Sequence, residues 1–255
     1  MMRSWLQFFR VVNLPTVPGD VLVGAAAVEA GLILGGAAGV CPPTAGLRPL
    51  VGASLAAVFI YLFGLADNDL VGAATDGVER PIPSGAISLG EARLARGLCL
   101  FAALAAGALA NLPPAWWAAA LALSVACVVY NRTKRCIAMG LCRGLNVVCG
   151  GLAAGFHPVG WREPAAVAWL VGCALVWTAY VAGVTMYSEG EAEDPARRRF
   201  VGLLIGAVVY LQLGALLAAY VAAPVALTRN LLLAGAGMLV ALRLAKRLLP
   251  GVSAS

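Results

Sequence analysis

The sequence predicts an all-α integral membrane protein with eight membrane-spanning helices, or nine if one predicted span is really two. Of its 255 residues, 62% are apolar and 12% are charged, whereas a soluble domain usually carries about 25% charged residues. Several apolar runs reach about 20 residues, which is enough for a helix to cross a bilayer. Gly and Ala are abundant, and small residues let helices pack closely in lipid.

The eight expected spans are separated by segments that do not suit a bilayer. Pro and Gly clusters mark turns at 41–46, 111–114 and 156–160, and polar acidic segments follow the second and sixth spans. The fifth span is short and rich in Gly, so a broken or tilted helix is expected there. In order, the spans cover about 15–38, 49–66, 93–111, 115–130, 143–158, 164–186, 200–223 and 227–248.

The distribution of Lys and Arg predicts the orientation in the membrane. Fifteen of the eighteen fall on one side of the expected bundle, and Arg48, Arg162 and Arg229 fall on the other. Positive residues concentrate on the cytoplasmic side, so we expect both termini and both acidic loops in the cytoplasm of a multi-pass plasma or inner membrane protein. This distribution explains the net charge of +6 without a nucleic-acid partner.

Cysteine and histidine usage excludes some kinds of site. The seven cysteines form no CxxC motif and most lie in or beside apolar runs, so we interpret them as small packing residues. His157 is the sole histidine of the sequence, which excludes a zinc site built from histidines.

The acidic segment 68–85, NDLVGAATDGVERPIPSG, is the most informative part of the chain. Carboxylates beside a membrane are costly and usually functional. Asp69 and Asp76 lie seven residues apart, two helical turns, so both can point the same way from one helix end. They suggest a site for a hard cation that also holds a phosphate ester; the alternative is a solvated loop.

The second acidic segment, YSEGEAEDP at 187–195, falls on the same side of the expected bundle. Carboxylates from two loops facing each other over a cavity can bind Mg²⁺, which takes oxygen ligands and is often shared with phosphates. Nearby cations would take the remaining oxygens of a diphosphate, and the candidates are Arg80, Lys134 and Arg135. The apolar interior would hold a hydrocarbon tail.

The spacing of the two acidic segments, four spans apart, suggests an internal repeat. We expect a single transmembrane domain over 1–255, formed by four-helix units over about 1–111 and 115–248.

These motifs resemble those of the UbiA superfamily of intramembrane prenyltransferases. The first motif reads Asn68, Asp69, Gly72 and Asp76, followed by ERPIPSG, and the second reads Tyr187, Ser188, Glu191 and Asp194. Supporting matches are RVVN at 10–13, YNRTKR at 130–135 and GLCRGLN at 140–146. The resemblance covers most of the chain and is closest to the branch found in Ebo-type gene clusters.

The resemblance implies a helical bundle that transfers a prenyl group from a magnesium-bound prenyl diphosphate to an acceptor, often aromatic or otherwise lipophilic. It implies that Asn68, Asp69 and Asp76 bind one Mg²⁺, and that Glu191 and Asp194 bind another. Asp69, Asp76, Lys134 and Arg135 would be the catalytic set, with Lys134, Arg135 and Arg80 on the diphosphate.

Further substrate contacts are expected from residues near these motifs. Asn13 lies where the family contacts the acceptor, although an Asn before Leu-Pro can also simply cap a helix. Asp20 lies inside the first span, where it would line the same cavity or pair with a neighbour as a structural acid. The remaining candidates are Arg143, Asn146 and Tyr187.

The sequence also departs from the family pattern. Gly72 stands where the family has an Asp, Val184 stands where ubiquinone-type members have an acid, and the chain ends after eight expected helices instead of nine. The leading function is therefore a Mg²⁺-dependent prenyltransferase. A membrane terpene cyclase on the same scaffold and a non-catalytic lipid-binding homologue remain as alternatives.

Overall fold

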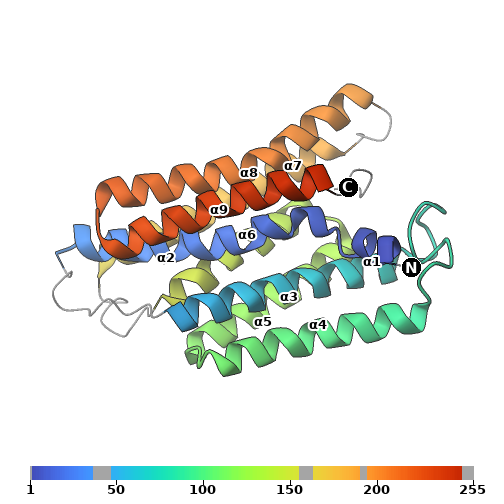
Figure 1. Cartoon of the computed structure of the whole chain (residues 1–255), viewed down its shortest axis with the longest axis horizontal. Coiled ribbons are helices and arrows are strands. Elements are labelled where there is room, and N and C mark those ends of the chain that lie inside the picture. Colours follow the sequence, from blue (N-terminus) through green and yellow to red (C-terminus); the bar gives the residue numbers. More distant parts are fainter. Residues whose placement is uncertain (1, 37–46, 155–162, 190–193, 249–255) are drawn as a thin grey trace.

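The computed structural model describes residues 2–36, 47–154, 163–189 and 194–248, and this part of the chain is helical (Figure 1). Eight helical segments in it are long and apolar enough to cross a membrane, which confirms the predicted fold class. The elements are α1 Met2–Phe8, η1 Val11–Thr16, α2 Val17–Leu34, α3 Leu47–Gly72, α4 Leu89–Leu109, α5 Pro114–Thr133, α6 Cys136–Ala153, α7 Pro164–Ser188, α8 Pro195–Ala222 and α9 Ala226–Leu248.

The helix boundaries differ from the expected ones where local capping decides them. Helix α4 begins at Leu89, four residues before the expected start. The Ser88 side chain accepts a hydrogen bond from the Glu91 N–H, and the Glu91 carboxylate accepts one from the Ser88 N–H. This capping box satisfies N–H groups that the first turn would otherwise leave unpaired, and it fixes the start of the helix.

The long helices run side by side along the longest axis of the molecule (Figure 1). Helices α3, α4 and α5 lie on one side, α8 and α9 lie on the opposite side, and α2 and α6 lie between them. The end of α3, the end of α7 and the start of α8 lie at the same end of the bundle as α1. The two acidic segments therefore begin at one end, as expected.

The centre of the bundle is the contact between α2 and α6. A Cβ on Gly24 would collide with the backbone carbonyl of Val147, and a Cβ on Gly150 would collide with that of Val21. Only glycine lets the two backbones approach so closely, which is the typical use of small residues between membrane helices. Helix α2 is consequently buried along most of its length.

A second, smaller hydrophobic cluster holds the segment 73–88 beneath α1. It contains Phe8 from α1, Ala66 from α3 and Ile87, which is 1% exposed. The Gln7 side chain also donates to the carbonyl of Glu79, at 3.1 Å. These contacts place Arg10, which follows α1, above the end of α3.

Candidate active site

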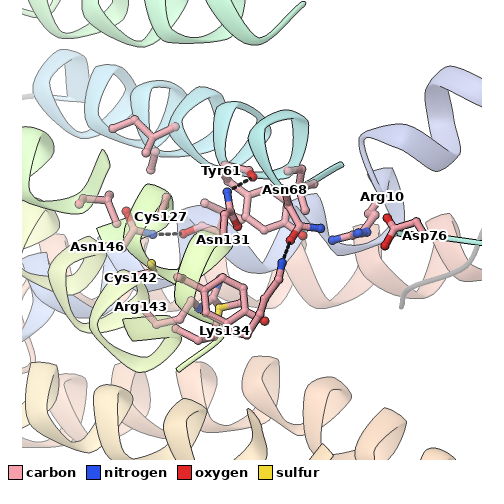
Figure 2. A pocket seen from close by; sticks show the side chains of 18 of the residues that line it. Arg10, Tyr61, Asn68, Asp76, Cys127, Asn131, Lys134, Cys142, Arg143 and Asn146 are labelled. Carbon is pink, nitrogen blue, oxygen red and sulfur yellow. Dashed lines mark hydrogen bonds between the residues drawn. The ribbon is translucent and has the colours of Figure 1, made fainter. Parts of the chain in front are cut away.

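A cavity of about 410 Å³ opens between α3, α5 and α6 at this end of the bundle (Figure 2). Figure 2 shows Arg10 and Asp76 at one end of it, Asn68 and Lys134 in the middle, and Cys127, Cys142 and Asn146 at the other end. The structure brings six of the residues predicted from the sequence to its wall: Asn68, Asp76, Arg80, Lys134, Arg143 and Asn146.

Asp69 lies behind the wall of this cavity, with only 3% of its side chain exposed. Its Oδ1 accepts hydrogen bonds from Arg10 Nη2 at 3.1 Å and from the Asn68 amide at 3.3 Å. Its Oδ2 is buried and has no hydrogen-bond partner within the described protein. A buried carboxylate oxygen without a donor is costly, so this oxygen is suited to a cation that enters the cavity.

Asp76 takes the space that Gly72 leaves. A Cβ on Gly72 would lie 2.5 Å from Asp76 Oδ2, because the chain makes one last turn there, with the Asp76 N–H donating to the Gly72 carbonyl at 2.8 Å. Position 72 has no acidic side chain, and the carboxylate of Asp76 occupies the space where such a side chain would begin.

Lys134 faces the cavity because α5 ends in a left-handed residue. Lys134 itself has φ +52° and caps α5, and its Nζ donates to Asn68 Oδ1. Burial lowers the pKa of Lys134, an effect that the nearby Asp76 carboxylate opposes. A bound phosphate would supply the same kind of compensation.

Arg135 follows Lys134 directly. It occupies the N-cap position of α6, is exposed, and is not among the residues that line the cavity. Of the predicted diphosphate contacts, Lys134 and Arg80 are therefore at the cavity and Arg135 is not.

A second lobe of about 360 Å³ adjoins the first cavity between α7, α8 and the start of the chain. Asn13 lines it, as do Val184 and Ser188 near the end of α7 and Arg198 in the first turn of α8. The two lobes share one wall, formed by Arg10, Tyr61, Leu65, Tyr130, Met139 and Arg143. Molecules placed in the two lobes would therefore lie next to one another at these residues.

Asp20 does not line either lobe; it is fully buried behind Arg143. Its Oδ2 pairs with Arg143 Nε at 3.0 Å and accepts from Asn146 at 3.2 Å. Its Oδ1 accepts from the Trp177 indole at 2.9 Å and from Gln212 at 2.7 Å. Asp20 thus links α2 to α6, α7 and α8, and its ion pair holds Arg143 at the wall that the two lobes share. This agrees with the expectation that Asp20 pairs with a neighbour as a structural acid.

The second acidic motif is only partly placed. Glu191 lies outside the described residues. Asp194 is exposed and caps α8, its Oδ1 accepting from the N–H groups of Ala196 and Arg197 at 2.8 and 3.2 Å. Tyr187 is 42% exposed, lies under the Arg197 guanidinium, and is absent from the walls of both lobes.

The sequence did not single out several residues of this site. Sequence reasoning assigns no role to Arg10, Tyr61, Tyr130 or Asn131, although three of them lie in the matched motifs RVVN and YNRTKR. Asp67 precedes the first motif directly; its carboxylate pairs with Arg96 at 2.9 Å and accepts from Asn131 at 2.9 Å. The sequence signal that could have pointed to Asp67 is the run of Asp67, Asn68 and Asp69 directly after an apolar segment.

The donor set fits a hard cation. Asn68 and Asp76 line the cavity, and Asp69 presents an unpartnered buried oxygen beside them. The described residues include no cluster of three His, Cys, Asp or Glu side chains, so the protein would fill only part of a coordination sphere. Mg²⁺ accepts such a site because it retains water and binds phosphate oxygens as well.

Comparisons with known proteins find solved structures with the same fold. A structure of a UbiA homolog from Archaeoglobus fulgidus bound to DMAPP and Mg²⁺ matches with a TM-score of 0.58 and 18% identity, over 94% of this chain and 86% of the other. The same homolog bound to GPP and Mg²⁺ matches with a TM-score of 0.55 and 16% identity, over 96% and 86%.

Another matching structure comes from work on the biosynthesis of digeranylgeranylglyceryl phosphate synthase in membranes. It matches with a TM-score of 0.56 and 14% identity, over 99% of this chain and 94% of the other. A search of curated proteins finds no match. The model of the UbiA prenyltransferase family matches residues 27–249, most of the sequence. The chain therefore belongs to the UbiA prenyltransferase family.

Proposed function

We propose that this protein transfers a prenyl group from a magnesium-bound prenyl diphosphate to an acceptor within the membrane. The observation that carries the proposal is the first lobe, which combines oxygen ligands and cations at one end with an apolar wall at the other. Family membership and the solved homolog structures with DMAPP or GPP and Mg²⁺ support it.

Asn68, Asp69 and Asp76 would hold one Mg²⁺, with water and diphosphate oxygens completing its shell. When bound, the metal neutralises negative charge that develops on the leaving diphosphate. A second Mg²⁺ at Glu191 and Asp194 stays a prediction, since Asp194 caps α8 and Glu191 lies outside the described residues.

Lys134 and Arg80 would bind the remaining diphosphate oxygens through charge-assisted hydrogen bonds. Arg135 stays a prediction for this role. The prenyl chain would extend along Ala57, Ile60 and Leu123, which line the apolar part of the same lobe. From Asn68 to Ala57, α3 descends roughly 16 Å into the bundle.

The acceptor would occupy the second lobe and meet the allylic carbon at the shared wall. There the allylic C–O bond breaks with its electron pair leaving on the diphosphate, and the acceptor bonds to that carbon and gives up a proton. Tyr61 and Tyr130 line this wall, and aromatic faces stabilise a nearby cation while they exclude water. Asn13 and Arg143 would contact the acceptor. Asn146 would contact the substrate at the far end of the first lobe, and a substrate contact by Tyr187 stays a prediction.

The second lobe favours a transferase over a terpene cyclase, because a cyclase needs no space for an acceptor. Gly72 is the feature that favours a non-catalytic homologue. We also propose that the end of the bundle with both lobes faces the cytoplasm of a plasma or inner membrane, because the basic residues concentrate there. Membership of the Ebo-type branch stays a prediction.

The test is turnover of radiolabelled geranyl, farnesyl and geranylgeranyl diphosphate by the purified protein in lipid nanodiscs. Each is measured with Mg²⁺ or EDTA, and with or without a lipophilic acceptor extract. Asp76→Asn is compared with Glu79→Gln, an exposed acid of the same segment. We expect acceptor-dependent turnover that EDTA and Asp76→Asn lower at least about 100-fold and that Glu79→Gln leaves unchanged.

Conversion without an acceptor would identify a cyclase instead. Binding of the diphosphate without turnover under every condition would support the non-catalytic alternative and overturn the proposal.

A further inference from the structure

Two cysteines from different helices face each other in the wall of the first lobe. Cys127 of α5 and Cys142 of α6 both line this cavity (Figure 2), and a side-chain hydrogen bond joins their thiol groups. The sulfur of Cys127 also lies against α3, because a Cβ on Gly64 would be 3.4 Å from it. The two thiols therefore lie where α3, α5 and α6 surround the lobe.

This pair differs from other cysteines that the structure describes. Cys99 and Cys149 are buried, as expected for small packing residues, whereas Cys127 and Cys142 are half-buried and line a cavity that opens at one end of the bundle. A thiol reacts when reagents can reach it, and a second thiol beside it can trap the first product. The interpretation of the cysteines as packing residues therefore does not account for Cys127 and Cys142.

The thiol pair lies between the two ends of the proposed substrate site. Lys134, which we propose as a diphosphate ligand, follows Cys127 by about two helical turns, roughly 10 Å along α5. Leu123, which we propose as a contact of the prenyl chain, precedes Cys127 by about one turn and lines the same lobe. A chain that extends from the diphosphate site to Leu123 must therefore pass the two thiols.

We propose that Cys127 and Cys142 form a redox-active dithiol, which a peroxide oxidises to a disulfide that hinders the entry of long prenyl chains into the first lobe. This inference rests on the proposed function, because it assigns a form of control to the same site. The position of the pair beside the path of the chain links the oxidation to substrate binding.

The oxidation consumes one hydrogen peroxide. One thiol loses its proton and its sulfur attacks the O–O bond, which breaks; the sulfur becomes a sulfenic acid, and the leaving hydroxide takes up the proton as water. The second thiol then attacks the sulfenic sulfur. The S–S bond forms, the S–O bond breaks, and the hydroxyl group leaves with the second thiol proton as another water. The two sulfurs together lose two electrons, which the peroxide oxygens gain.

A disulfide constrains α5 and α6 because its dimensions are fixed. The sulfurs bond at about 2.05 Å, and the two Cα atoms must lie about 4.4–6.8 Å apart. In the reduced protein a hydrogen bond joins the thiols, so the two helices can still adjust to a chain in the lobe. Oxidation removes this freedom. Cytosolic disulfides are usually transient and redox-sensing, which suits a reversible control at the end of the bundle that we propose faces the cytoplasm.

Three serine variants separate the pair from the other cysteines. Cys127→Ser and Cys142→Ser each remove one thiol and keep a small polar side chain that cannot form the bond. Cys173→Ser is the matched control, because Cys173 of α7 is also half-buried but lies outside both lobes.

The experiment treats the whole chain in phosphatidylcholine nanodiscs with hydrogen peroxide, followed or not by dithiothreitol. Mass spectrometry of the digested protein identifies linked cysteines, and binding of dimethylallyl and geranylgeranyl diphosphate with Mg²⁺ is measured on the same samples. We expect peptides joined through Cys127 and Cys142. Peroxide should weaken binding of geranylgeranyl diphosphate about tenfold, a loss of about 1.4 kcal/mol, and should affect dimethylallyl diphosphate, a single isoprene unit, much less.

Dithiothreitol should restore the binding of geranylgeranyl diphosphate. Each variant is compared with its own untreated sample, so that a change in basal affinity does not enter the comparison. Cys127→Ser and Cys142→Ser should lose the response to peroxide, and Cys173→Ser should keep it.

The outcomes separate this inference from the proposed function. Thiols that stay free after peroxide treatment, or a disulfide that joins other cysteines, overturn the dithiol. A Cys127–Cys142 disulfide that leaves binding of geranylgeranyl diphosphate unchanged overturns its role in the site, and so does a response to peroxide that persists in both pair variants. Failure of the reduced, unmodified protein to bind either diphosphate counts against the proposed function itself, whereas the linked peptides test the dithiol without any substrate.

Discussion

Arg10 and Asp69 form an ion pair of 3.1 Å across 59 residues of sequence, and the second oxygen of Asp69 has no donor within the described protein. Arg10 has a left-handed backbone, with φ +42°, which is uncommon for a residue with a side chain. The Arg10 guanidinium therefore already lies against the Asp69 carboxylate, which we propose as a metal ligand. Arg10 and the metal would compete for the same charge.

The first prediction follows from this competition. Arg10→Gln should tighten Mg²⁺ binding about tenfold, because it removes a positive charge worth about 1.4 kcal/mol of repulsion. The measurement is a Mg²⁺ titration of thermal stability in the presence of a non-hydrolysable geranyl diphosphate analogue. Arg93→Gln, which removes an exposed cation of α4 outside both lobes, should leave Mg²⁺ binding unchanged. Weaker Mg²⁺ binding in Arg10→Gln would mean that Arg10 orients Asp69 for the metal instead.

The second prediction concerns Gly72. In Gly72→Ala the new Cβ would collide with the Asp76 carboxylate, so Asp76 must move away. Mg²⁺ binding should then weaken about tenfold, the usual loss when a residue that orients a metal ligand is changed. Gly90→Ala is the control, because a Cβ there meets only the Ser88 hydroxyl, at 4.0 Å. The same Mg²⁺ titration decides. An unchanged Mg²⁺ affinity would show that the folded-back position of Asp76 is not the one that binds metal.

The third prediction concerns the centre of the bundle. Gly150→Ala places a methyl group against the backbone of α2 at Val21, so the helices must separate and the free energy of unfolding should fall by about 1–3 kcal/mol. Gly172→Ala, in open space on α7, should change it little. Unfolding in mixed micelles with increasing SDS measures the difference. Equal stability of the two variants would contradict the close approach of α2 and α6.

The helical framework was predictable from the sequence because length and hydropathy determine it. A run of about 20 apolar residues must be a helix in lipid, so the number of spans follows without any tertiary contact. The boundaries were less accurate, because a capping box at Ser88 or a left-handed cap at Lys134 sets them. The internal repeat of four-helix units stays a prediction.

The site was predictable where its residues are close in sequence. Asn68 and Asp69 lie near the end of α3, as their spacing predicts, but α3 ends at Gly72 and Asp76 lies beyond it. A turn after the helix, and not helical spacing, brings Asp76 back toward Gly72. Arg10 and Tyr61 could not be assigned this way, because their place depends on how α1 folds over the end of α3. Asp20 shows the same limit: its position in an apolar run indicated a buried acid, but its four partners come from three distant helices.

The last prediction assigns Asp20 a positioning role. Four N–H donors converge on its two oxygens, and Asp20→Asn leaves a single acceptor oxygen and no counter-charge for Arg143. The free energy of unfolding should fall by about 3–5 kcal/mol, the usual cost of breaking a buried ion pair from one side. Because Arg143 lines both lobes, its displacement should also change substrate binding.

The measurement that separates these effects is steady-state kinetics with the acceptor varied. If Asp20 positions Arg143, the variant should raise KM for the acceptor more than it lowers kcat, at a temperature where the protein stays folded. Glu29→Gln is the control, since Glu29 lies on the same helix but outside both lobes. A loss of stability with unchanged KM would reduce Asp20 to a purely structural residue, because Arg143 would then reach the wall without its partner.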